Sequence, residues 1–359
     1  MVSQALLRRQ GQCFILQDTC LTFRRALGLT NKGMGLGEDF KVDSWSQEDC
    51  RRVDGMGWGL RQPSCSRGMA SSSDGGLKEA MTYCQRLVKE KEYENYLWCS
   101  QLKPEYRAPI IALRALGIEI QAVQEHARTE MLLMMRYQWW KDSVRKAFEV
   151  TQSYEMSQPV MKAVSELVRQ ATISKYRVMR MIDAHETDAL RTSPMVSMGE
   201  LEDYAEGTCS QLLYMQLEAC GLATAATEHA ASHLGKAIGL SQVLRNAVVY
   251  LKKGKTYFPE DICKKYGVTP TEFLVNDSPS DVAFEVAKVA KAHLDAARTH
   301  EVIEPEAAPL FNQALSVELY LNALEKANFD IFSASMHRGG YLPVEYLIKL
   351  KWRMMREEW

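Results

Sequence analysis

The sequence lacks any long uncharged apolar run. No stretch approaches the roughly 18 apolar residues that a membrane-spanning helix requires, so we expect any membrane contact to be peripheral. An excess of charge is also absent, since 44 Lys and Arg nearly balance 45 Asp and Glu. The resulting net charge of −1 argues against a nucleic-acid-binding protein and against an acidic disordered chain.

Paired cysteines and nucleotide-binding loops are missing as well. The nine cysteines form no C-x-x-C pair, a pattern that favours reduced thiols over a disulfide framework or a zinc ribbon. Gly254, Lys255 and Thr256 have the spacing of the end of a phosphate-binding loop, but Val249 stands where its first glycine is required. The glycine-rich residues 33–37 and 55–59 lack a strand-turn-helix context, so no dinucleotide-binding fold is predicted.

The first 75 residues differ in composition from the rest. They are rich in Gly and Ser, and residues 1–37 carry five Arg and Lys against the single acid Asp18. An Arg-rich, acid-poor start is typical of a mitochondrial transit segment. The alternative is a disordered or wrongly assigned extension, with Met69 as the true start. We therefore predict that residues 1–75 are a targeting segment and a disordered linker, followed by a helical domain over 76–359.

From Leu77 onward the apolar residues follow a helical period. Leu113, Leu116, Ile120, Val123 and Ala127 recur at three- and four-residue spacing, which predicts one buried helical stripe. Ser197 followed by Glu200 is typical of a helix start, and that helix is predicted to continue to Gly221. No alternating stretch is long enough to build a sheet, so the sequence predicts an all-α fold.

Two clusters are candidate metal ligands. His229 and His233 are one helical turn apart, a spacing that can place two imidazoles on one ion. No third ligand is evident, and we favour helix packing with a hydrogen bond to a neighbouring helix. Residues 183–188 are the densest acidic cluster, interpreted as a solvated helix face. No two aspartates four residues apart lie on a long predicted helix, although such pairs hold Mg²⁺ against a diphosphate.

Two segments resemble the two signatures of the squalene/phytoene synthase family. Residues 112–125 are similar to the first signature, and residues 233–246 with 255–259 are similar to the second. Residues 137–142 resemble the Q-W-W-like stretch of that family, and 83–84 and 104–107 resemble its first helix and bend. The resemblance implies an all-α helical bundle of the isoprenoid-synthase type, with a central cavity.

The resemblance also places the metal-binding aspartates of that family on four positions of this chain. These signature positions are Gln121, Glu125, Asn246 and Tyr250. Gln and Asn are neutral, and Tyr carries no negative charge near neutral pH. Because one carboxylate cannot assemble a cluster of several Mg²⁺ ions, we expect a non-catalytic pseudoenzyme with no metal ion and no cofactor.

Positive side chains remain near the second signature. Arg245, Lys236, Lys252 and Lys255 are candidate contacts for an anion or a lipid diphosphate. The alternative, which we favour, is that these residues form an ordinary basic helix face.

Four further segments are similar to one branch of the family, the mitochondrial complex I assembly factors of the assembly factor 6 type. They are residues 200–206, 229–237, 258–263 and 328–332, within a resemblance that covers about 80–355. It implies an assembly factor on the matrix side of the mitochondrial inner membrane that acts early, with peripheral membrane contact. Its implied partners are complex I subunits or other assembly factors, not nucleic acid.

Two alternatives stay open. One is a prenyl-diphosphate transferase with an altered metal site. The other is an isoprenoid- or quinone-binding protein, which is compatible with an assembly role. Residues 131–135 and the pair Trp139 and Trp140 belong either to an interface or to the core. We favour the core, because Met and Trp at helical spacing usually occupy a helical interior.

Overall fold

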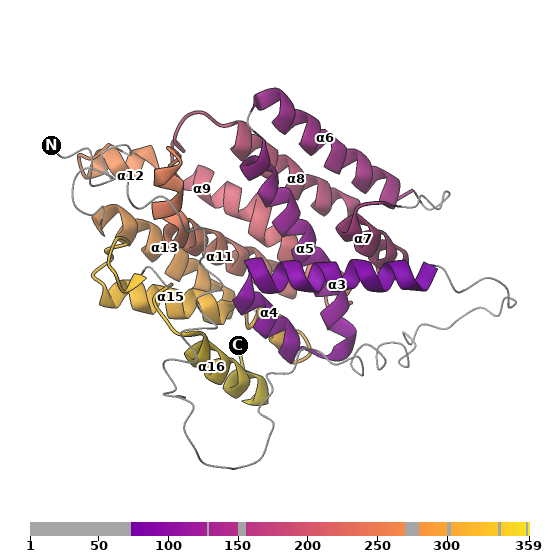
Figure 1. Ribbon diagram of the computed structural model, residues 1–359. Coiled ribbons are helices and arrows are strands. Elements are labelled where there is room, and N and C mark those ends of the chain that lie inside the picture. Colours follow the sequence, from indigo (N-terminus) through magenta and orange to yellow (C-terminus); the bar gives the residue numbers. More distant parts are fainter. Residues whose placement is uncertain are drawn as a thin grey trace, which may run out of the picture. The chain divides into compact units, whose positions relative to one another are not determined.

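The computed structural model describes residues 73–127, 129–149, 156–269, 280–299, 303–336, 339–356 and 358–359. Every regular element within these ranges is a helix, which confirms the predicted all-α fold (Figure 1). Residues 1–72, on which the predicted targeting segment and nearly all of the linker fall, lie outside the described residues. The helices are α3 (Ser73–Lys91), α4 (Tyr93–Gln101), α5 (Pro104–His126), α6 (Glu130–Ala147), α7 (Pro159–Gln170), α8 (Lys175–Leu190), α9 (Met198–Ala205), η2 (Glu206–Ser210), α10 (Gln211–Ala219), α11 (Ala225–Lys252), α12 (Glu260–Lys265), α13 (Ser280–Thr299), α14 (Ala308–Phe311), α15 (Ala314–Lys326) and α16 (Pro343–Arg356).

Helix α5 carries the first signature through the core. Pro104 occupies its first turn, where a missing backbone N–H costs nothing. Of the predicted stripe, Leu113, Leu116, Ile120 and Val123 are buried, whereas Ala127, just past the end of the helix, is only partly buried. The end of the stripe leads to the signature positions at the C-terminal end of the helix, so burial of the stripe fixes where those side chains lie.

Helix α11 carries the second signature and is the longest helix described. Thr224 and Thr227 form a capping box at its start, which satisfies backbone N–H groups that would otherwise have no partner. The helix packs against α13, α9, η2 and α15. Directly after its C-terminal end, Lys253 lies 3.0 Å from Glu125 of α5, so the ends of the two signature helices lie close together.

The helix predicted from Ser197 is confirmed, with a local change of winding. The Ser197 hydroxyl accepts a hydrogen bond from the Glu200 backbone N–H at 3.3 Å, and α9 begins at Met198. The chain then passes through the π-helical segment η2 into α10, which ends at Ala219. π-helical turns are rare and often lie at functional sites. Here the turn places Cys209 and Ser210 toward α11, where they donate to Gln242 and to the Ser232 carbonyl.

Two glycines of α11 allow this close packing. A Cβ atom built at Gly235 would lie 2.5 Å from Cα of Ser210, and one at Gly239 would lie 2.5 Å from Cβ of Ala205. Both distances are shorter than van der Waals contact. A larger residue at either position would push α11 away from α9 and η2, and the cavity described below would change shape.

The prediction that the Met and Trp residues of α6 lie in the core is wrong for most of them. Met131, Met135 and Trp139 have exposed fractions of 73%, 64% and 46%, and Met134 is also exposed. Only Trp140 of the tryptophan pair is buried. Helix α6 is apolar on two opposite faces, and the face with Tyr137 and Trp140 is the one that packs inward. Periodicity identifies apolar faces but does not say which face a neighbour covers.

Within the described residues, no helix combines the length and the apolar character needed to cross a lipid bilayer.

Candidate functional site

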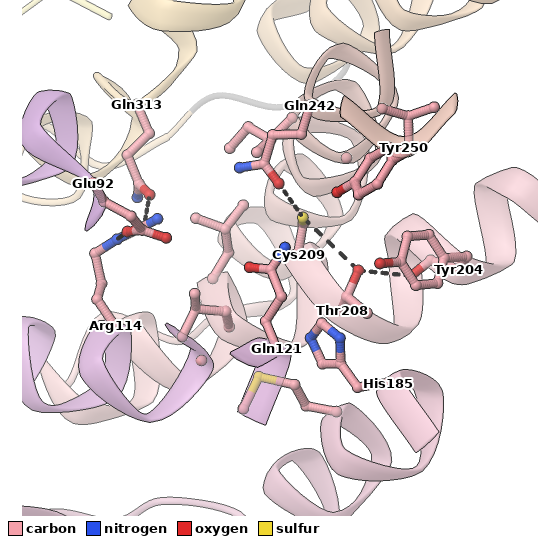
Figure 2. A pocket seen from close by; sticks show the side chains of 17 residues that line it. Glu92, Arg114, Gln121, His185, Tyr204, Thr208, Cys209, Gln242, Tyr250 and Gln313 are labelled. Carbon is pink, nitrogen blue, oxygen red and sulfur yellow. Dashed lines mark hydrogen bonds and ion pairs between the residues drawn. The ribbon is translucent and has the colours of Figure 1, made fainter. Parts of the chain in front are cut away.

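A cavity lies between α5, α8, α11 and the α9–η2–α10 segment, with an empty volume of about 690 Å³ that includes its open mouth. Figure 2 shows its side chains. The lining residues are Glu92, Arg114, Gly117, Gln121, Met181, His185, Tyr204, Thr208, Cys209, Leu212, Leu213, Ile238, Gly239, Gln242, Val243, Tyr250 and Gln313. Both family signatures contribute to this set, and the cavity lies within the helical bundle for which a central cavity was expected.

One end of the cavity holds a buried ion pair, which we call the charged end. Arg114 is 5% exposed, and its Nε donates to Oε2 of Glu92 at 2.5 Å. Nη1 of Arg114 donates to Oε1 of Gln313 at 2.7 Å, and Nε2 of Gln313 donates in turn to Oε1 of Gln216 at 3.0 Å. Glu92 is the only acid among the lining residues. Its charge is therefore neutralised within the protein.

The wall between the two ends is polar but uncharged near neutral pH. Burial lowers the pKa of His185 to about 4, so its imidazole is neutral. Burial raises the pKa of the Cys209 thiol to about 11, so it remains protonated. Cys209 donates weakly to Gln242, with 3.6 Å between Sγ and Oε1, and Thr208 donates to the Tyr204 carbonyl at 2.7 Å. Near neutral pH the wall therefore offers neither a thiolate nucleophile nor a cationic acid.

The signature positions occupy the other part of the cavity and its surroundings. Gln121 and Tyr250 line the cavity, one from α5 and one from α11 (Figure 2). Burial raises the pKa of the Tyr250 phenol to about 12, so it is neutral. Glu125 and Asn246 are not among the lining residues. The structure thus brings two of the four positions to the cavity, and neither of these two carries a charge.

Two lysines connect the helix ends at which the signatures finish. Nζ of Lys253, directly after α11, lies 3.0 Å from Oε1 of Glu125 at the end of α5. Nζ of Lys255 donates to Oδ2 of Asp188 at 2.8 Å and lies 3.4 Å from the Gln124 side chain. These protein cations lie between carboxylate and amide oxygens of α5 and α8. The single carboxylate left at the signature positions is therefore already paired.

The interpretation of residues 183–188 as a solvated face is wrong at two positions, His185 and Asp188, which are both buried. The Asp183 side chain is 55% exposed, as predicted, and it pairs with Lys141. Asp188 is only 3% exposed. It accepts hydrogen bonds from the Tyr257 hydroxyl at 2.6 Å and from Arg191 at 3.1 Å, as well as from Lys255. A buried carboxylate is stable only with such partners, and three donors from later parts of the chain supply them.

The candidate anion contacts do not converge on the cavity. None of Arg245, Lys236, Lys252 and Lys255 is among its lining residues. Arg245 binds the Glu94 carboxylate with two nitrogens, at 2.6 and 2.9 Å, and Lys255 is held by Asp188. Lys236 is half-buried along α11. The role of these cations in anion binding therefore stays a prediction.

The histidine pair takes part in packing between helices, as predicted. Nδ1 of His233 lies 2.9 Å from Nδ1 of His293 on α13, and Nε2 of His293 lies 2.5 Å from a carboxylate oxygen of Glu202. The His229 and His233 rings meet edge to face, with 5.0 Å between centroids. The pair thus links α11 to α13 and α9.

Sequence reasoning missed the charged end and most of the wall. Arg114 stands in the middle of the apolar stripe of α5, flanked by buried Leu113 and Ala115. An arginine within such a run predicts a buried partner, which is the signal that was available. Its partner Gln313 lies 199 positions away in the chain, so spacing cannot identify it.

Known proteins similar to this chain fall into two groups. A family profile described as squalene/phytoene synthase matches residues 88–354. NADH dehydrogenase (ubiquinone) complex I, assembly factor 6 of Mus musculus is 34% identical, with 87% of this chain and 91% of that protein covered. The protein of the same name from Homo sapiens is 34% identical, with 80% and 86% covered. The Dictyostelium discoideum homologue is 31% identical, with 68% and 70% covered.

Solved structures of low sequence identity share the fold. A dehydrosqualene synthase matches with a TM-score of 0.64 at 17% identity, covering 79% of this chain and 100% of the other. Squalene synthase HpnC from Alicyclobacillus acidocaldarius matches with a TM-score of 0.62 at 16% identity, covering 72% and 99%. At these identities the likeness is evidence for the fold, and the helical architecture expected from the signatures is confirmed.

Proposed function

The chain belongs to the squalene/phytoene synthase family, and we propose that within this family it is an assembly factor for mitochondrial NADH:ubiquinone oxidoreductase, respiratory complex I. Its similarity to complex I assembly factor 6 extends over most of both chains at about 34% identity. That coverage includes the region of both signatures, so the similarity is not confined to one motif. Its partners are then complex I subunits or other assembly factors.

We further propose that the protein acts without catalysis, as a scaffold. The observation that carries this is the state of the four signature positions. Gln121, Asn246 and Tyr250 are uncharged, and Glu125 is paired with Lys253. Ionisation of a prenyl diphosphate requires Mg²⁺ ions held by several carboxylates. Glu92 cannot replace them, because Arg114 already neutralises it.

The same observations disfavour a prenyl-diphosphate transferase with an altered metal site. An isoprenoid or quinone ligand of the cavity is a separate question. The neutral polar wall around His185 and Gln242 is compatible with a neutral head group. Direct binding measurements decide whether the cavity holds such a ligand, and either result is compatible with the assembly role.

The proposed location is the mitochondrion, at the matrix side of the inner membrane. The Arg-rich composition of residues 1–37 supports import, and the naming of the relatives supports the organelle. The proposed division is a targeting segment and linker over 1–75 and a helical domain over 76–359. Comparing the N-terminus of the protein isolated from mitochondria with Met1 tests the import, and limited proteolysis of the full chain tests the boundary.

Depletion of the protein tests the assembly role. We expect complex I to fall on native gels while complexes III and IV remain, and we expect the wild-type chain to restore it. Unchanged complex I in depleted cells would contradict the proposal, and so would an equal loss of all three complexes.

Diphosphate release tests the scaffold role. We expect no Mg²⁺-dependent release from farnesyl or geranylgeranyl diphosphate above the level of a buffer control. The double variant Gln121→Asp with Asn246→Asp places acids at two of the four signature positions. Its diphosphate release is compared with that of the unmodified chain under the same conditions. Turnover by the unmodified chain would revive the transferase hypothesis, whereas tight binding without turnover would identify a ligand of the cavity.

A further inference from the structure

Helix α16 is apolar on two faces, of which only one is covered. Tyr346 and Leu350 are fully buried against the unit. The opposite side presents an outer stripe of Val344, Ile348, Trp352 and Met355, with exposed fractions of 42%, 64%, 56% and 73%. Spacings of four, four and three residues place these side chains on one line along the helix.

Polar contacts hold this orientation. Arg353, near the buried side, donates to Glu318 of α15 at 2.8 Å, and Glu318 also accepts from Arg298 of α13. Past the end of the helix, the Glu358 carbonyl accepts from Asn312 at 3.1 Å, and the Trp359 ring lies 4.9 Å from that of Phe311. The helix therefore cannot turn its outer stripe inward without losing buried contacts.

Cations flank the outer stripe within one helical turn. Helix α16 carries Lys349, Lys351, Arg353 and Arg356 against the single acid Glu345, in a chain whose net charge is −1. Lys349 pairs with Glu345 at 2.8 Å, and Arg356 pairs with Glu358 at 2.9 Å. All four partners are about half exposed, and exposed pairs of this kind are weak. Arg356 also lies over the Trp352 ring, 5.6 Å from its centroid.

This combination matches an anionic lipid surface. Amphipathic helices that lie in the plane of a bilayer combine an apolar stripe with flanking Lys and Arg, and Trp is enriched at the level of the head groups. Long cationic side chains can reach phosphate groups while the apolar stripe enters the acyl boundary. Each basic residue near an anionic surface adds further attraction.

The exposed apolar face of α6 also has exposed cations beside it, Arg136 and Lys146, and α6 carries two acids, Glu130 and Asp142, where α16 carries one. Lys141 of α6 is held by Asp183 and Glu186 of α8, and Arg145 is paired with Asp142. Figure 1 shows α6 and α16 at opposite ends of the helical unit. The face of α6 therefore serves as a comparison surface that also combines exposed apolar side chains with cations, at another place on the unit.

We propose that the outer stripe of α16 and its cations Lys349, Lys351 and Arg356 form a binding surface for anionic phospholipid. The helix lies in the plane of the interface, with Ile348 and Trp352 inserted and the lysines at the phosphates. The inference draws on the proposed function only for its setting at a membrane. None of the described helices can cross a bilayer. The surface on α16 would be the contact that holds the protein at the membrane.

Vesicle flotation of the full chain tests this surface. The probes are phosphatidylcholine vesicles with and without phosphatidylglycerol. We expect binding to the anionic vesicles that weakens as salt is added. Ile348→Ser with Trp352→Ser should lose about tenfold or more in binding, because two exposed apolar side chains no longer insert. Lys349→Gln with Lys351→Gln should lose about fivefold to tenfold on anionic vesicles alone.

The control is Met131→Ser with Trp139→Ser on α6, which should bind as the wild type does. All variants keep residues 1–72, so any lipid binding by that segment is common to them. Equal binding by the α16 variants and the wild type would overturn the proposal, and so would an equal loss in the α6 control. If vesicle binding is absent but the α16 variants fail to restore complex I, the stripe is a protein-docking surface instead. A chain that binds vesicles and does not restore complex I would leave the lipid surface standing and overturn the assembly role.

Discussion

The charged end of the cavity and its signature positions differ in how they use carboxylates. At the charged end, Glu92 is retained and bound by a buried arginine. At the signature positions, three of four side chains are uncharged and the fourth, Glu125, faces a lysine at the surface. Each of these two acids is thus paired with a cation of another segment, Glu92 with Arg114 of α5 and Glu125 with Lys253 after α11. The family fold is preserved by contacts that do not depend on the family chemistry.

The largest effect on stability is expected from a substitution that breaks the ion pair at the charged end. Arg114→Met leaves the Glu92 carboxylate in the cavity without its cation, and we expect a loss of about 3–5 kcal/mol in the free energy of unfolding. Urea denaturation measures it. Adding Glu92→Gln in the same chain should recover part of the loss, because the uncompensated charge is gone. A loss below about 1 kcal/mol for Arg114→Met would show that the pair is dispensable.

The pH dependence of stability tests the wall. The pKa of His185 is about 4 in the folded protein and about 6.5 when unfolded, so the unfolded chain binds the proton more readily. The neutral imidazole is compatible with the fold above pH 6.5, and stability is lost as pH falls from there toward 4. The shift corresponds to a loss on the order of 3 kcal/mol.

Denaturation of His185→Gln over the same pH range isolates this contribution. We expect a shallower decline between pH 6.5 and 4 than in the wild type, because glutamine does not titrate. Parallel declines would mean that other groups govern the acid sensitivity.

A smaller effect is expected at the link between α8 and the turn after α11. Asp188→Asn retains shape but removes the charge that Lys255 and Arg191 face, and we expect a loss of about 2–3 kcal/mol. Asp183→Asn on the same helix is the matched control, and we expect a change within about 1 kcal/mol because its side chain is 55% exposed. Similar losses in both would contradict the distinction between the buried and the solvated acid.

The smallest effect is expected at the signature positions. Glu125→Ala removes an ion pair whose two side chains are about half exposed. Such pairs contribute less than about 1 kcal/mol, so thermal denaturation should change little. A larger loss would show that the Lys253–Glu125 contact is needed to hold the ends of α5 and α11 together.

The sequence predicts the helical architecture well because the buried side of a helix recurs in the sequence as apolar residues at three- and four-residue spacing. The stripe on α5 and the helix start at Ser197 are both found where the pattern places them. The loss of acids at the signature positions is also readable, because it depends only on residue identity within matched motifs.

What the sequence does not reveal depends on long-range contacts. Asp188 belongs to an acidic run that looks solvated, and its burial follows from donors 67 and 69 positions further along the chain, Lys255 and Tyr257. The outward position of Met131 and Trp139 depends on which face of α6 the rest of the unit covers. Composition is the same in either case, so periodicity alone cannot decide.

The central claim, that this chain supports complex I assembly without chemistry at its signature positions, is tested most directly in cells lacking the protein. Complex I is measured on native gels after rescue with the wild-type chain or with Glu125→Ala, expressed at equal levels. We predict that both restore complex I fully. Restoration only by the chain with the intact carboxylate would contradict the claim and point to a reaction in the cavity.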